Sequence, residues 1–364
     1  MRQNTEVLII GAGQAGLAAG YYLKERHIDF LIIDKGEKLG HVWSSRYDSL
    51  VLFTPRWYSS LPGMKLDGEP DGYAGKDEVA QYLQRYAGRY ALPVQLSTEL
   101  LALVRTDTGF SARTTKGTIT AQQVIVATGP FQSPRIPDFA DRFSPRVKQI
   151  HTSAYANMSS LNEGSVLVVG GGNSGAQIAV ELASEREVYL SVSHPMKFLP
   201  MEILGKSIFW WFKKLGILGF HRNSWAGRRL RAQKDPIFGK ELISLIEQGK
   251  VRVKPKTVKI HSDRITFADN TQLQVDNVLW ATGFVSEYKW MEIEGAKDRS
   301  GQPLHDGGLS PIPGLYYIGQ AWQNTRGSAL LGGVGTDAKH IVETLLNARD
   351  STRVILHDRT YGYG

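Results

Sequence analysis

Short apolar runs alternate with glycine-rich turns along this chain, and one such pattern opens the sequence. Residues 7–10 are apolar, GAGQAG follows, and after a stretch of helical periodicity residues 28–33 form a second apolar run. Continuous apolar runs of this length, bounded by turn residues, are typical of strands buried on both faces of a parallel sheet. The pattern predicts a strand–helix–strand unit of an α/β protein.

The turn in this unit has the spacing of a dinucleotide-binding loop. Gly11, Gly13 and Gly16 follow the first strand, and Asp34 ends the second. Gly11 would permit a tight turn, Gly13 would let the backbone approach a pyrophosphate at the helix N-terminus, and Gly16 would allow close helix–strand packing. Asp34 is expected to accept hydrogen bonds from ribose hydroxyls. The unit therefore predicts a bound dinucleotide.

The same pattern occurs a second time. An apolar run at 166–169 leads into GGGNSG, a helix is expected to about Ser184, and a further apolar run follows at 188–192. Each unit continues into hairpin-like segments and then an apolar strand that ends in Ala-Thr-Gly, at 127–129 and again at 281–283. A repeat of this kind is stronger evidence than either glycine motif alone. We expect an α/β fold with two Rossmann-like domains.

The two units differ at the end of their second strand. The first has Asp34, which suits an unphosphorylated ribose, whereas the second has Ser193 and His194, with Lys197 close by and no acid. We therefore assign FAD to the first unit and NADPH or NADH to the second.

The chain continues after the second unit. A strand at 315–318, a glycine-rich loop and an amphipathic helix from about Gly335 follow it. The backbone N–H groups of residues 333–335 are expected to face the electron-rich pyrimidine edge of the flavin. Both ends of the chain would then form the FAD-binding domain. The expected ranges are 1–158 with 278–364 for FAD, and 159–277 for NAD(P)H, with a basic, apolar insertion at 198–240.

Candidate cofactor contacts follow from these motifs. Those expected at FAD are Gly11, Gly13, Gln14, Ala15, Gly16, Asp34, Lys35, Gly40, Val42, Trp43, Thr54, Ala127, Thr128, Gly129, Gly319, Gln320 and Gly333. Those expected at NAD(P)H are Gly170, Gly172, Asn173, Ser174, Gly175, Ser193, His194, Lys197, Thr282 and Gly283.

The order of these motifs resembles the flavin-containing monooxygenase family over nearly the whole chain. The motifs that carry the resemblance are GAGQAG, Asp34, Gly40-x-x-Trp43, FTPRWYSSLPG at 53–63, the two Ala-Thr-Gly strands, GGGNSG and SALLGGVGTDA. A compact bacterial branch, often described as flavoproteins of cation transport, is the most similar. The resemblance implies that NAD(P)H reduces the flavin. It further implies that O2 forms a flavin C4a-(hydro)peroxide, which oxygenates the sulfur or nitrogen of a small molecule.

Two departures from the family pattern concern catalysis. In the signature F-x-G-x-x-x-H-x-x-x-(Y/F/W), His151 and Tyr155 keep the spacing, but Pro145 and Val147 replace the phenylalanine and the glycine. Phe53 stands where several relatives carry an asparagine that contacts flavin and nicotinamide. An NAD(P)H oxidase or reductase that oxygenates no substrate therefore stays open. So does a flavoprotein accessory or redox sensor of a cation transporter.

Three residues are candidates for a catalytic role: Phe53, His151 and Asn324. Two interpretations of His151 stay open, one in which it positions the nicotinamide and one in which it is a hydrogen-bonded structural histidine. Asn324 lies in the loop after Gly319, where the carboxyl ends of the strands should place the flavin ring. The polar and aromatic residues of this loop suit a substrate pocket.

Composition excludes several kinds of chemistry. The 364 residues contain no cysteine, so disulfides, thiolate metal sites and a dithiol relay are excluded from this chain, and no metal site is predicted. No apolar run approaches the roughly 18 residues of a membrane span, and no signal peptide is recognised. A cytoplasmic protein is expected.

Positive charge is concentrated in one region. From Lys197 to Lys259 there are fifteen basic and four acidic residues, whereas the whole chain has a net charge of +8. Such a region attracts anionic lipid, nucleic acid or a phosphate-bearing cofactor. Because no nucleic-acid motif accompanies it, we expect no nucleic acid partner. The apolar residues 198–220 are expected to form a lid or substrate entrance, while peripheral membrane contact and a homodimer contact stay open.

Overall fold

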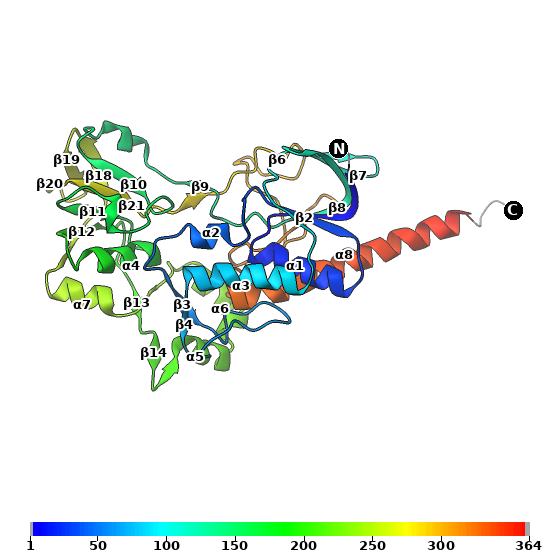
Figure 1. The fold of residues 1–364 in the computed structure, drawn as a ribbon, viewed down its shortest axis with the longest axis horizontal. Helices are drawn as coiled ribbons and strands as arrows, with labels where there is room; N and C mark the ends of the chain where they lie inside the picture. The colour runs from blue at the N-terminus through cyan, green and yellow to red at the C-terminus, as the bar shows by residue number, and fades with distance from the viewer. Residues whose placement is uncertain (1–2, 361–364) are drawn as a thin grey trace.

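The structure is a computed structural model that describes the backbone of residues 3–360 and the side chains of residues 3–349. Two sheets, one mixed and one fully parallel, lie next to each other along the long axis of the molecule, and a smaller part made of short helices and strands lies beneath them (Figure 1). This mixed α/β architecture confirms the fold class expected from the sequence. No helix within the described residues is long and apolar enough to cross a membrane.

The first sheet forms around the apolar runs of the first unit. Strand β1 lies between β2 and β8, all parallel, with Ile9 opposite both Ile32 and Ile125. The first half of β8 pairs with β7 in an antiparallel meander, and its second half pairs with β23 from the C-terminal part of the chain. The strands, in spatial order, are β5 (Val94–Gln95), β2 (Phe30–Ile33), β1 (Gln3–Ile10), β8 (Gly117–Val126), β7 (Gly109–Thr114) and β6 (Leu100–Thr106), with β23 (Leu315–Tyr317) beside β8.

Three helices bury one face of this sheet. They are α1 (Gln14–Glu25), α3 (Lys76–Arg89) and α8 (Leu331–Thr360). Leu17, Leu83 and Ile341, one from each helix, are fully buried in one core with Ile9 and Ile32 of the sheet. The C-terminal helix thus belongs to the same layer as the first helix of the chain.

Helix α8 begins four residues before the expected Gly335. The glycines before that position gave no helical signal, because glycine is a poor helix former. Here they serve packing: a Cβ on Gly332 would lie 1.7 Å from the carbonyl oxygen of Tyr58, and one on Gly333 would lie 2.0 Å from that of Gly327. Only glycine lets the first turn of α8 approach these loops so closely.

The second sheet is fully parallel and repeats the first. Its strands, in spatial order, are β10 (Lys148–His151), β21 (Asn277–Trp280), β11 (Val166–Val169), β12 (Val188–Ser191) and β17 (Val251–Lys254). Helices α4 (Asn173–Leu182) and α7 (Glu241–Glu247) bury one face. A meander of β18 (Thr257–His261), β19 (Arg264–Phe267) and β20 (Gln272–Gln274) covers the other. The expected strand at 166–169 is confirmed, and the helix ends two residues before Ser184.

The second sheet extends beyond the range 159–277 expected for its domain, because β10 and most of β21 lie outside it. Strand β10 reads Lys-Gln-Ile-His and has no apolar run, so the sequence pattern did not reveal it. β21 ends in an Ala-Thr-Gly turn, as β8 does. In the structure the two endings occupy equivalent positions in two separate sheets.

Residues 198–240 contain several short strands and helices. They form β13 (Phe198–Leu199), β14 (Glu202–Ile203), β15 (Lys206–Ser207), α5 (Ile208–Lys214), α6 (Trp225–Arg231) and β16 (Ile237–Phe238). The Arg222 N–H donates to the carbonyl of Asn324 at 2.9 Å, and the Gly327 N–H donates to that of Leu218 at 3.1 Å. This insertion therefore rests on the loop that precedes α8.

The two units also contact each other directly. The segments after the two Ala-Thr-Gly turns pair as an antiparallel ribbon of β9 (Ser133–Pro134) and β22 (Phe284–Val285). From α4, Gln177 Nε2 donates to the carbonyl of Val51 at 3.1 Å, and Gln177 Oε1 accepts from the Tyr47 hydroxyl at 2.7 Å. Val51 belongs to β3 (Val51–Pro55), which pairs with β4 (Tyr73–Gly75) and follows the one-turn helix α2 (His41–Ser44).

Candidate functional site

The first glycine turn has the geometry of a phosphate cradle. Gly11 has φ +108°, and a Cβ there would lie 2.5 Å from the carbonyl oxygen of Ala127. A Cβ on Gly16 would lie 1.9 Å from the carbonyl oxygen of Gly11, whereas one on Gly13 would meet nothing within 4 Å. Gly11 thus packs against the end of β8, and Gly16 packs against Gly11. The third glycine faces open space at the N-terminus of α1, where the backbone N–H groups favour an anion.

The second glycine turn repeats this geometry. A Cβ on Gly170 would lie 2.3 Å from the carbonyl oxygen of Ala281, and one on Gly175 would lie 2.0 Å from that of Gly170. Gly172, like Gly13, faces open space with nothing within 4 Å. The structure therefore contains two matching cradles, one at each helix N-terminus. At both, the space next to the middle glycine is open, which is compatible with the expected FAD and NAD(P)H.

Asp34 already has backbone partners. Its Oδ2 accepts from the Ala12 N–H and its Oδ1 accepts from the Gly36 N–H, both at 2.7 Å. The carboxylate therefore holds the glycine turn against the end of β2, a role that the sequence did not indicate. Each carboxylate oxygen has a second lone pair. Contact with a ribose hydroxyl stays a prediction.

Several other candidate FAD contacts line or brace the first cradle. Gln14 donates from Nε2 to the carbonyl of Ala329 at 3.0 Å, which links α1 to the loop before α8. A Cβ on Gly319 would lie 2.9 Å from Cβ of Ala15, so the loop after β23 passes directly over α1. Gln320 donates from Nε2 to the Tyr288 hydroxyl at 3.0 Å.

The first Ala-Thr-Gly turn is also braced. Ala127 is buried, and Gln132 donates from Nε2 to Thr128 Oγ1 at 3.1 Å and to the carbonyl of Gly129 at 2.9 Å. Gln132 Oε1 accepts from the Glu287 N–H at 3.0 Å, so this glutamine joins the first Ala-Thr-Gly turn to the segment that follows the second.

The remaining candidate FAD contacts differ in exposure. Lys35 and Val42 are exposed, and Trp43 is half-buried against the first core. Gly40 has φ +75°, and a Cβ there would lie 2.7 Å from the backbone of Ala80 in α3. The fifth residue, Thr54, is buried, and its hydroxyl lies 2.7 Å from that of Ser59.

The N-terminus of α8 differs from the expectation at Gly333. The Gly333 N–H donates to the carbonyl of Leu330 at 3.0 Å, so it is used within the turn. Among the described residues, no partner is recorded for the N–H groups of Leu331 and Gly332. Because α8 begins earlier than expected, its free donors lie about two residues earlier as well.

The candidate NAD(P)H contacts fall into two groups. Ser174, Ser193 and Lys197 are exposed around the second cradle, and Ser193 Oγ lies 3.1 Å from Nδ1 of the half-buried His194. Asn173, by contrast, has a structural role. Its Nδ2 donates to the carbonyl of Pro236 and its Oδ1 accepts from the Phe238 N–H, both at 3.0 Å. The side-chain amide thus fastens the insertion to α4, and only its backbone remains for a cofactor.

Two further candidates lie in the second Ala-Thr-Gly turn, at the hinge between the units. The Thr282 hydroxyl donates to the carbonyl of Arg135. The carbonyl of Gly283 accepts from the Arg135 N–H at 2.9 Å. These bonds join the turn after β21 to Arg135, in the segment that follows the first Ala-Thr-Gly turn.

His151 is buried and hydrogen-bonded at both ring nitrogens. Only 4% of the surface of His151 is exposed. The Ser153 N–H donates to Nδ1 at 3.1 Å, so Nε2 carries the proton and donates to the carbonyl of Gly283 at 3.0 Å. Burial lowers the pKa of His151, and the nearby Arg46 lowers it further, although the bond to Gly283 opposes this. Of the two interpretations, the geometry favours a residue that fixes the hinge.

Replacement of His151 by glutamine should reduce stability most at neutral and higher pH. The folded state holds the neutral imidazole, whereas the unfolded chain takes up a proton below about pH 6.5. The contribution of His151 is therefore complete above that pH and is lost as the pH falls. We expect about 1–2 kcal/mol for its two hydrogen bonds. Thermal midpoints of wild type and His151→Gln should differ at pH 8 and converge on acidification.

The exposed His340 on α8 provides the control, and His340→Gln should follow wild type at every pH. A gap between wild type and His151→Gln that grows as the pH falls would contradict the neutral, buried histidine.

Phe53 lies in an aromatic cluster that joins the first unit to the insertion. Its ring stacks on Phe238 with centroids 4.6 Å apart and on Phe209 at 6.0 Å. Tyr58 lies 5.7 Å from Phe209, and burial raises the Tyr58 pKa to about 12. The position expected to hold an asparagine in relatives therefore contributes an apolar ring to the contact between β3, α5 and β16.

Asn324 is bonded to a residue that the sequence did not single out. Its Nδ2 donates to Asp337 Oδ1 at 2.8 Å. Asp337 is buried on α8, and its Oδ2 has no partner among the described protein atoms. A buried carboxylate oxygen without a donor is costly, so this oxygen is a candidate acceptor for a bound molecule. Its only sequence signal was a charged residue on the apolar face of a helix.

Arg46 was also missed. Its guanidinium lies 4.5 Å from the ring centroid of Phe131 and 4.9 Å from that of Phe284. Each ring belongs to the segment that follows one of the two Ala-Thr-Gly turns. Burial lowers the pKa of Arg46. The stacked arginine links the first unit to the segments that follow both Ala-Thr-Gly turns. These residues are far apart in sequence, so the contact exists only in the folded chain.

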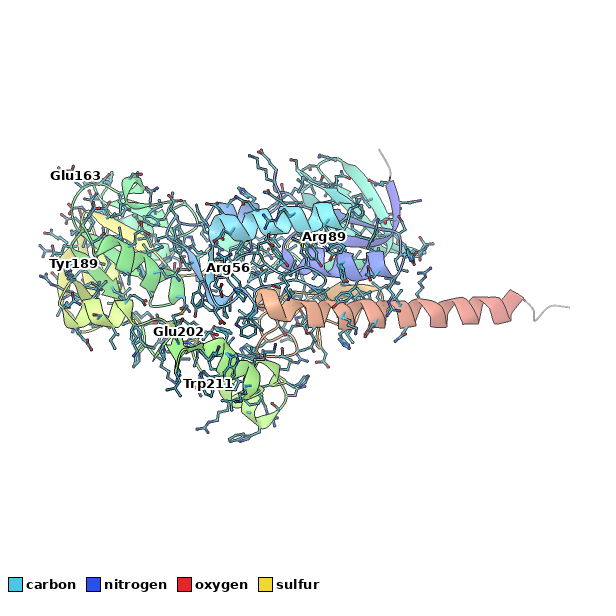
Figure 2. The ribbon with its side chains drawn as sticks, turned by 60° about the horizontal axis from the view of Figure 1, so that its bottom comes forward. Arg56, Arg89, Glu163, Tyr189, Glu202 and Trp211 are labelled. Atoms are coloured by element: carbon cyan, nitrogen blue, oxygen red, sulfur yellow. The ribbon has the colours of Figure 1, made fainter. Side chains whose placement is uncertain are left out.

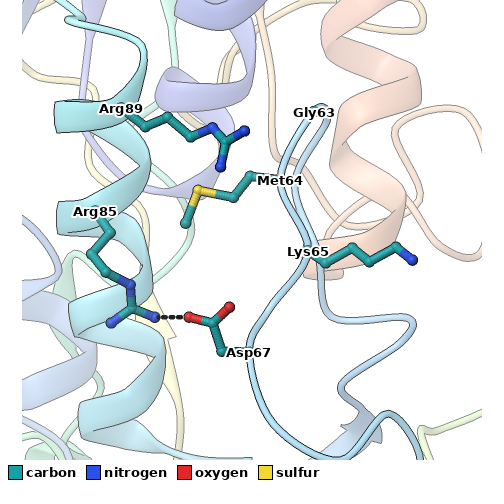
Figure 3. Close-up of a pocket in the computed structure, with 6 residues that line it drawn as sticks. All are labelled: Gly63, Met64, Lys65, Asp67, Arg85 and Arg89. Atoms are coloured by element: carbon teal, nitrogen blue, oxygen red, sulfur yellow. Dashed lines mark hydrogen bonds and ion pairs between the residues drawn. The ribbon is translucent and has the colours of Figure 1, made fainter.

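A pocket of about 600 Å³ lies between α3 and the loop 63–67 (Figure 3). Arg85 donates to Asp67 at 2.9 Å across it, and Lys65 and Arg89 are exposed at its edge. None of its lining residues belongs to either cradle, so this pocket is separate from the candidate site.

Comparisons with known proteins agree with the two cradles. A profile of the family described as pyridine nucleotide-disulphide oxidoreductase matches residues 8–198. A Geobacillus kaustophilus protein, named as an uncharacterized CzcO-like oxidoreductase, is 57% identical over 347 residues, covering 95% of this chain and all of that protein. Indole-3-pyruvate monooxygenase YUCCA4 of Oryza sativa subsp. japonica is 27% identical over 403 residues, covering 97% and 88%.

The solved structures include a similar fold. The flavin-containing monooxygenase from Stenotrophomonas maltophilia superposes with a TM-score of 0.80 at 25% identity, covering 95% of this chain and 99% of that one. This match confirms the resemblance expected from the motifs. The chain belongs to the pyridine nucleotide-disulphide oxidoreductase family and is a flavin-dependent oxidoreductase.

Proposed function

We propose that this protein is an FAD-dependent NAD(P)H monooxygenase that oxygenates a soft sulfur or nitrogen of a small molecule. NAD(P)H supplies two electrons, one atom of O2 goes to the substrate, and the other leaves as water. Bound FAD would supply hydride acceptance and the reaction of its reduced form with O2. The proposal rests on the pair of matching glycine cradles, in a fold that matches a flavin-containing monooxygenase over nearly its whole length.

The residues of this chain bind, orient and exclude water. The N-termini of α1 and α4 would hold the two pyrophosphates through backbone N–H groups. Hydrogen bonds of Gln14 and Gln132 brace the loops around the first cradle. The stacked rings of Phe53, Phe209 and Phe238 close the contact between the first unit and the insertion without polar atoms. An apolar contact of this kind would exclude water, which favours oxygen transfer to an apolar substrate over release of the oxygen as peroxide.

Phe53 supports a second candidate function. A phenylalanine offers no hydrogen bond to a cofactor or an oxygen intermediate. The alternative is an NAD(P)H oxidase that passes both electrons to O2 and releases hydrogen peroxide. A relay to an internal dithiol, which the family name includes, is excluded because the chain has no cysteine.

Product balance separates the two candidates. The holoenzyme is incubated with NAD(P)H, O2 and a thioether, and sulfoxide and peroxide are measured against NAD(P)H consumed. If the protein is a monooxygenase, a thioether that it accepts should give about 0.5 mole or more of sulfoxide per mole of NAD(P)H consumed. A panel of thioethers and amines that gives only stoichiometric peroxide favours the oxidase. Absence of NAD(P)H oxidation altogether would leave neither candidate standing.

Selectivity for the nicotinamide cofactor should be low. Ser193 and His194 offer no guanidinium to the 2′ position, and Lys197 Nζ already donates to Gln233 Oε1 at 3.1 Å. No acid follows the second strand to repel a phosphate. We expect kcat/KM values for NADH and NADPH within about tenfold of each other. Ser193→Arg should shift the ratio about tenfold toward NADPH, through a bidentate bond to the phosphate.

The measurement is the rate of flavin reduction at limiting NADH and NADPH, at low and high salt. A wild-type preference above about a hundredfold, or about 2.7 kcal/mol, would mean that another residue reads the 2′ position.

A further inference from the structure

The insertion presents an apolar and basic outer surface that neither cradle uses. Its inner face is buried, with Phe209 2% exposed among the rings that contact Phe53. Three apolar residues of the insertion, Leu204, Leu215 and Trp225, are 86%, 62% and 73% exposed. Figure 2 shows the insertion projecting from the rest of the molecule, with Glu202 and Trp211 on the projecting part.

The hairpin of β14 and β15 carries the most exposed of these residues. Its two-residue turn is Leu204–Gly205, both with positive φ, at +52° and +69°. Asparagine, aspartate or glycine is preferred at such positions, so leucine is unfavourable here both for the backbone and for its contact with water. Trp211 donates from Nε1 to the carbonyl of Ile203 at 3.0 Å, which holds the hairpin against α5. Leu204 is held in an exposed position, so its side chain can leave water only by contacting an apolar partner outside the chain.

Basic residues without a carboxylate partner lie near the exposed apolar residues in sequence. Residues 198–240 contain nine basic and two acidic residues. The exposed basic residues next to the apolar ones in sequence are Lys206, Lys213, Lys214, Arg228, Arg229 and Arg231. None of these six has a carboxylate within 4.0 Å among the described residues. One of the two acids, Asp235, is already paired with Arg326.

We propose that this surface docks on an anionic lipid bilayer, with Leu204, Leu215 and Trp225 in the interface and the cations on the headgroups. A bilayer offers an apolar layer for leucine, an interface for tryptophan and negative charge for lysine and arginine. A second copy of the chain fits poorly, since two surfaces of the same positive sign would repel each other. Nucleic acid would satisfy the cations but offers no apolar layer for Leu204.

Docking would also place the aromatic cluster behind α5 next to the membrane, because Phe209 lies on the inner face of that helix. This step rests on the proposed function: a substrate dissolved in the bilayer would reach the site through the insertion. The docking itself does not depend on oxygenation and is tested without substrate.

The test is cosedimentation of the holoenzyme with vesicles of pure phosphatidylcholine or of phosphatidylcholine with about one third phosphatidylglycerol. Wild type should bind the anionic vesicles at least tenfold more tightly, and high salt should abolish the difference. Leu204→Ser should weaken binding about fivefold to tenfold through lost apolar burial. The double variant Lys213→Gln, Lys214→Gln should weaken it about tenfold or more through lost charge.

A matched control is Val258→Ser, since Val258 is also an exposed apolar residue, 46% exposed on β18. It should bind vesicles like wild type, and all variants should keep their FAD and their NAD(P)H oxidation rate. Equal binding to both vesicles, or equal losses for Leu204→Ser and Val258→Ser, would overturn the proposal. So would a wild type that ignores vesicles and instead shifts a DNA duplex or forms a dimer that Leu204→Ser disrupts. If docking holds while product analysis gives only peroxide, the proposed function fails and the docking stands.

Discussion

Gly13→Val should fold normally and purify with little or no FAD. Gly13 precedes α1 with φ −76° and ψ −175°, an extended conformation that valine adopts readily. A Cβ at this position meets no atom of the protein within 4 Å. The added side chain therefore occupies only the space in front of the α1 N-terminus, where the pyrophosphate of FAD would lie.

The expected loss of affinity follows from the bonds that the valine blocks. Hydrogen bonds to a charged group contribute about 1.5–3 kcal/mol each. Losing two of them would weaken FAD binding by about a hundredfold to ten-thousandfold. The flavin content of purified protein, from the ratio of visible to ultraviolet absorbance, measures this directly. Full flavin content in a folded Gly13→Val protein would place FAD elsewhere.

A control that separates binding from folding is available three residues on. A Cβ on Gly16 would lie 1.9 Å from the carbonyl oxygen of Gly11, so Gly16→Ala must distort the turn itself. It should lower the thermal midpoint as well as the flavin content. Gly13→Val should keep the midpoint of the apoprotein to within the effect of a weaker helix cap, about 1 kcal/mol.

The sequence predicted the two cradles because their geometry is local. Gly11 and Gly170 need positive φ, and Gly16 and Gly175 need close approach to the backbone, so residue type and spacing report the turn directly. The repetition of the pattern then predicted the second parallel sheet.

The partners of individual side chains were not predictable in this way. The amide of Asn173 bonds to residues 236–238, and the guanidinium of Arg46 stacks on Phe131 and Phe284. These contacts join segments far apart in sequence, and no local period encodes them. Asp337 was missed for the same reason, since its partner Asn324 lies in a loop whose path depends on β23 and α8.

Gly172→Val should retain FAD and lose reduction by NAD(P)H. Gly172 stands before α4 with φ −88° and ψ −179°, and a Cβ there meets nothing within 4 Å, so the fold should tolerate valine as it does at position 13. The blocked space lies at the second cradle, in a separate sheet from the first.

Because the two cradles share no glycine, the two losses should be independent. Anaerobic stopped-flow reduction of the flavin by NADPH or NADH should slow at least a hundredfold at limiting cofactor, since two charge-assisted hydrogen bonds to the pyrophosphate are lost. Dithionite should still reduce the same sample fully, which shows that the flavin remains intact and accessible. If Gly172→Val instead lost its flavin while folded, or was reduced by NAD(P)H at the wild-type rate, the assignment of the second cradle to the nicotinamide cofactor would be wrong. Opposite phenotypes for two valines in equivalent positions would thus assign one cofactor to each cradle.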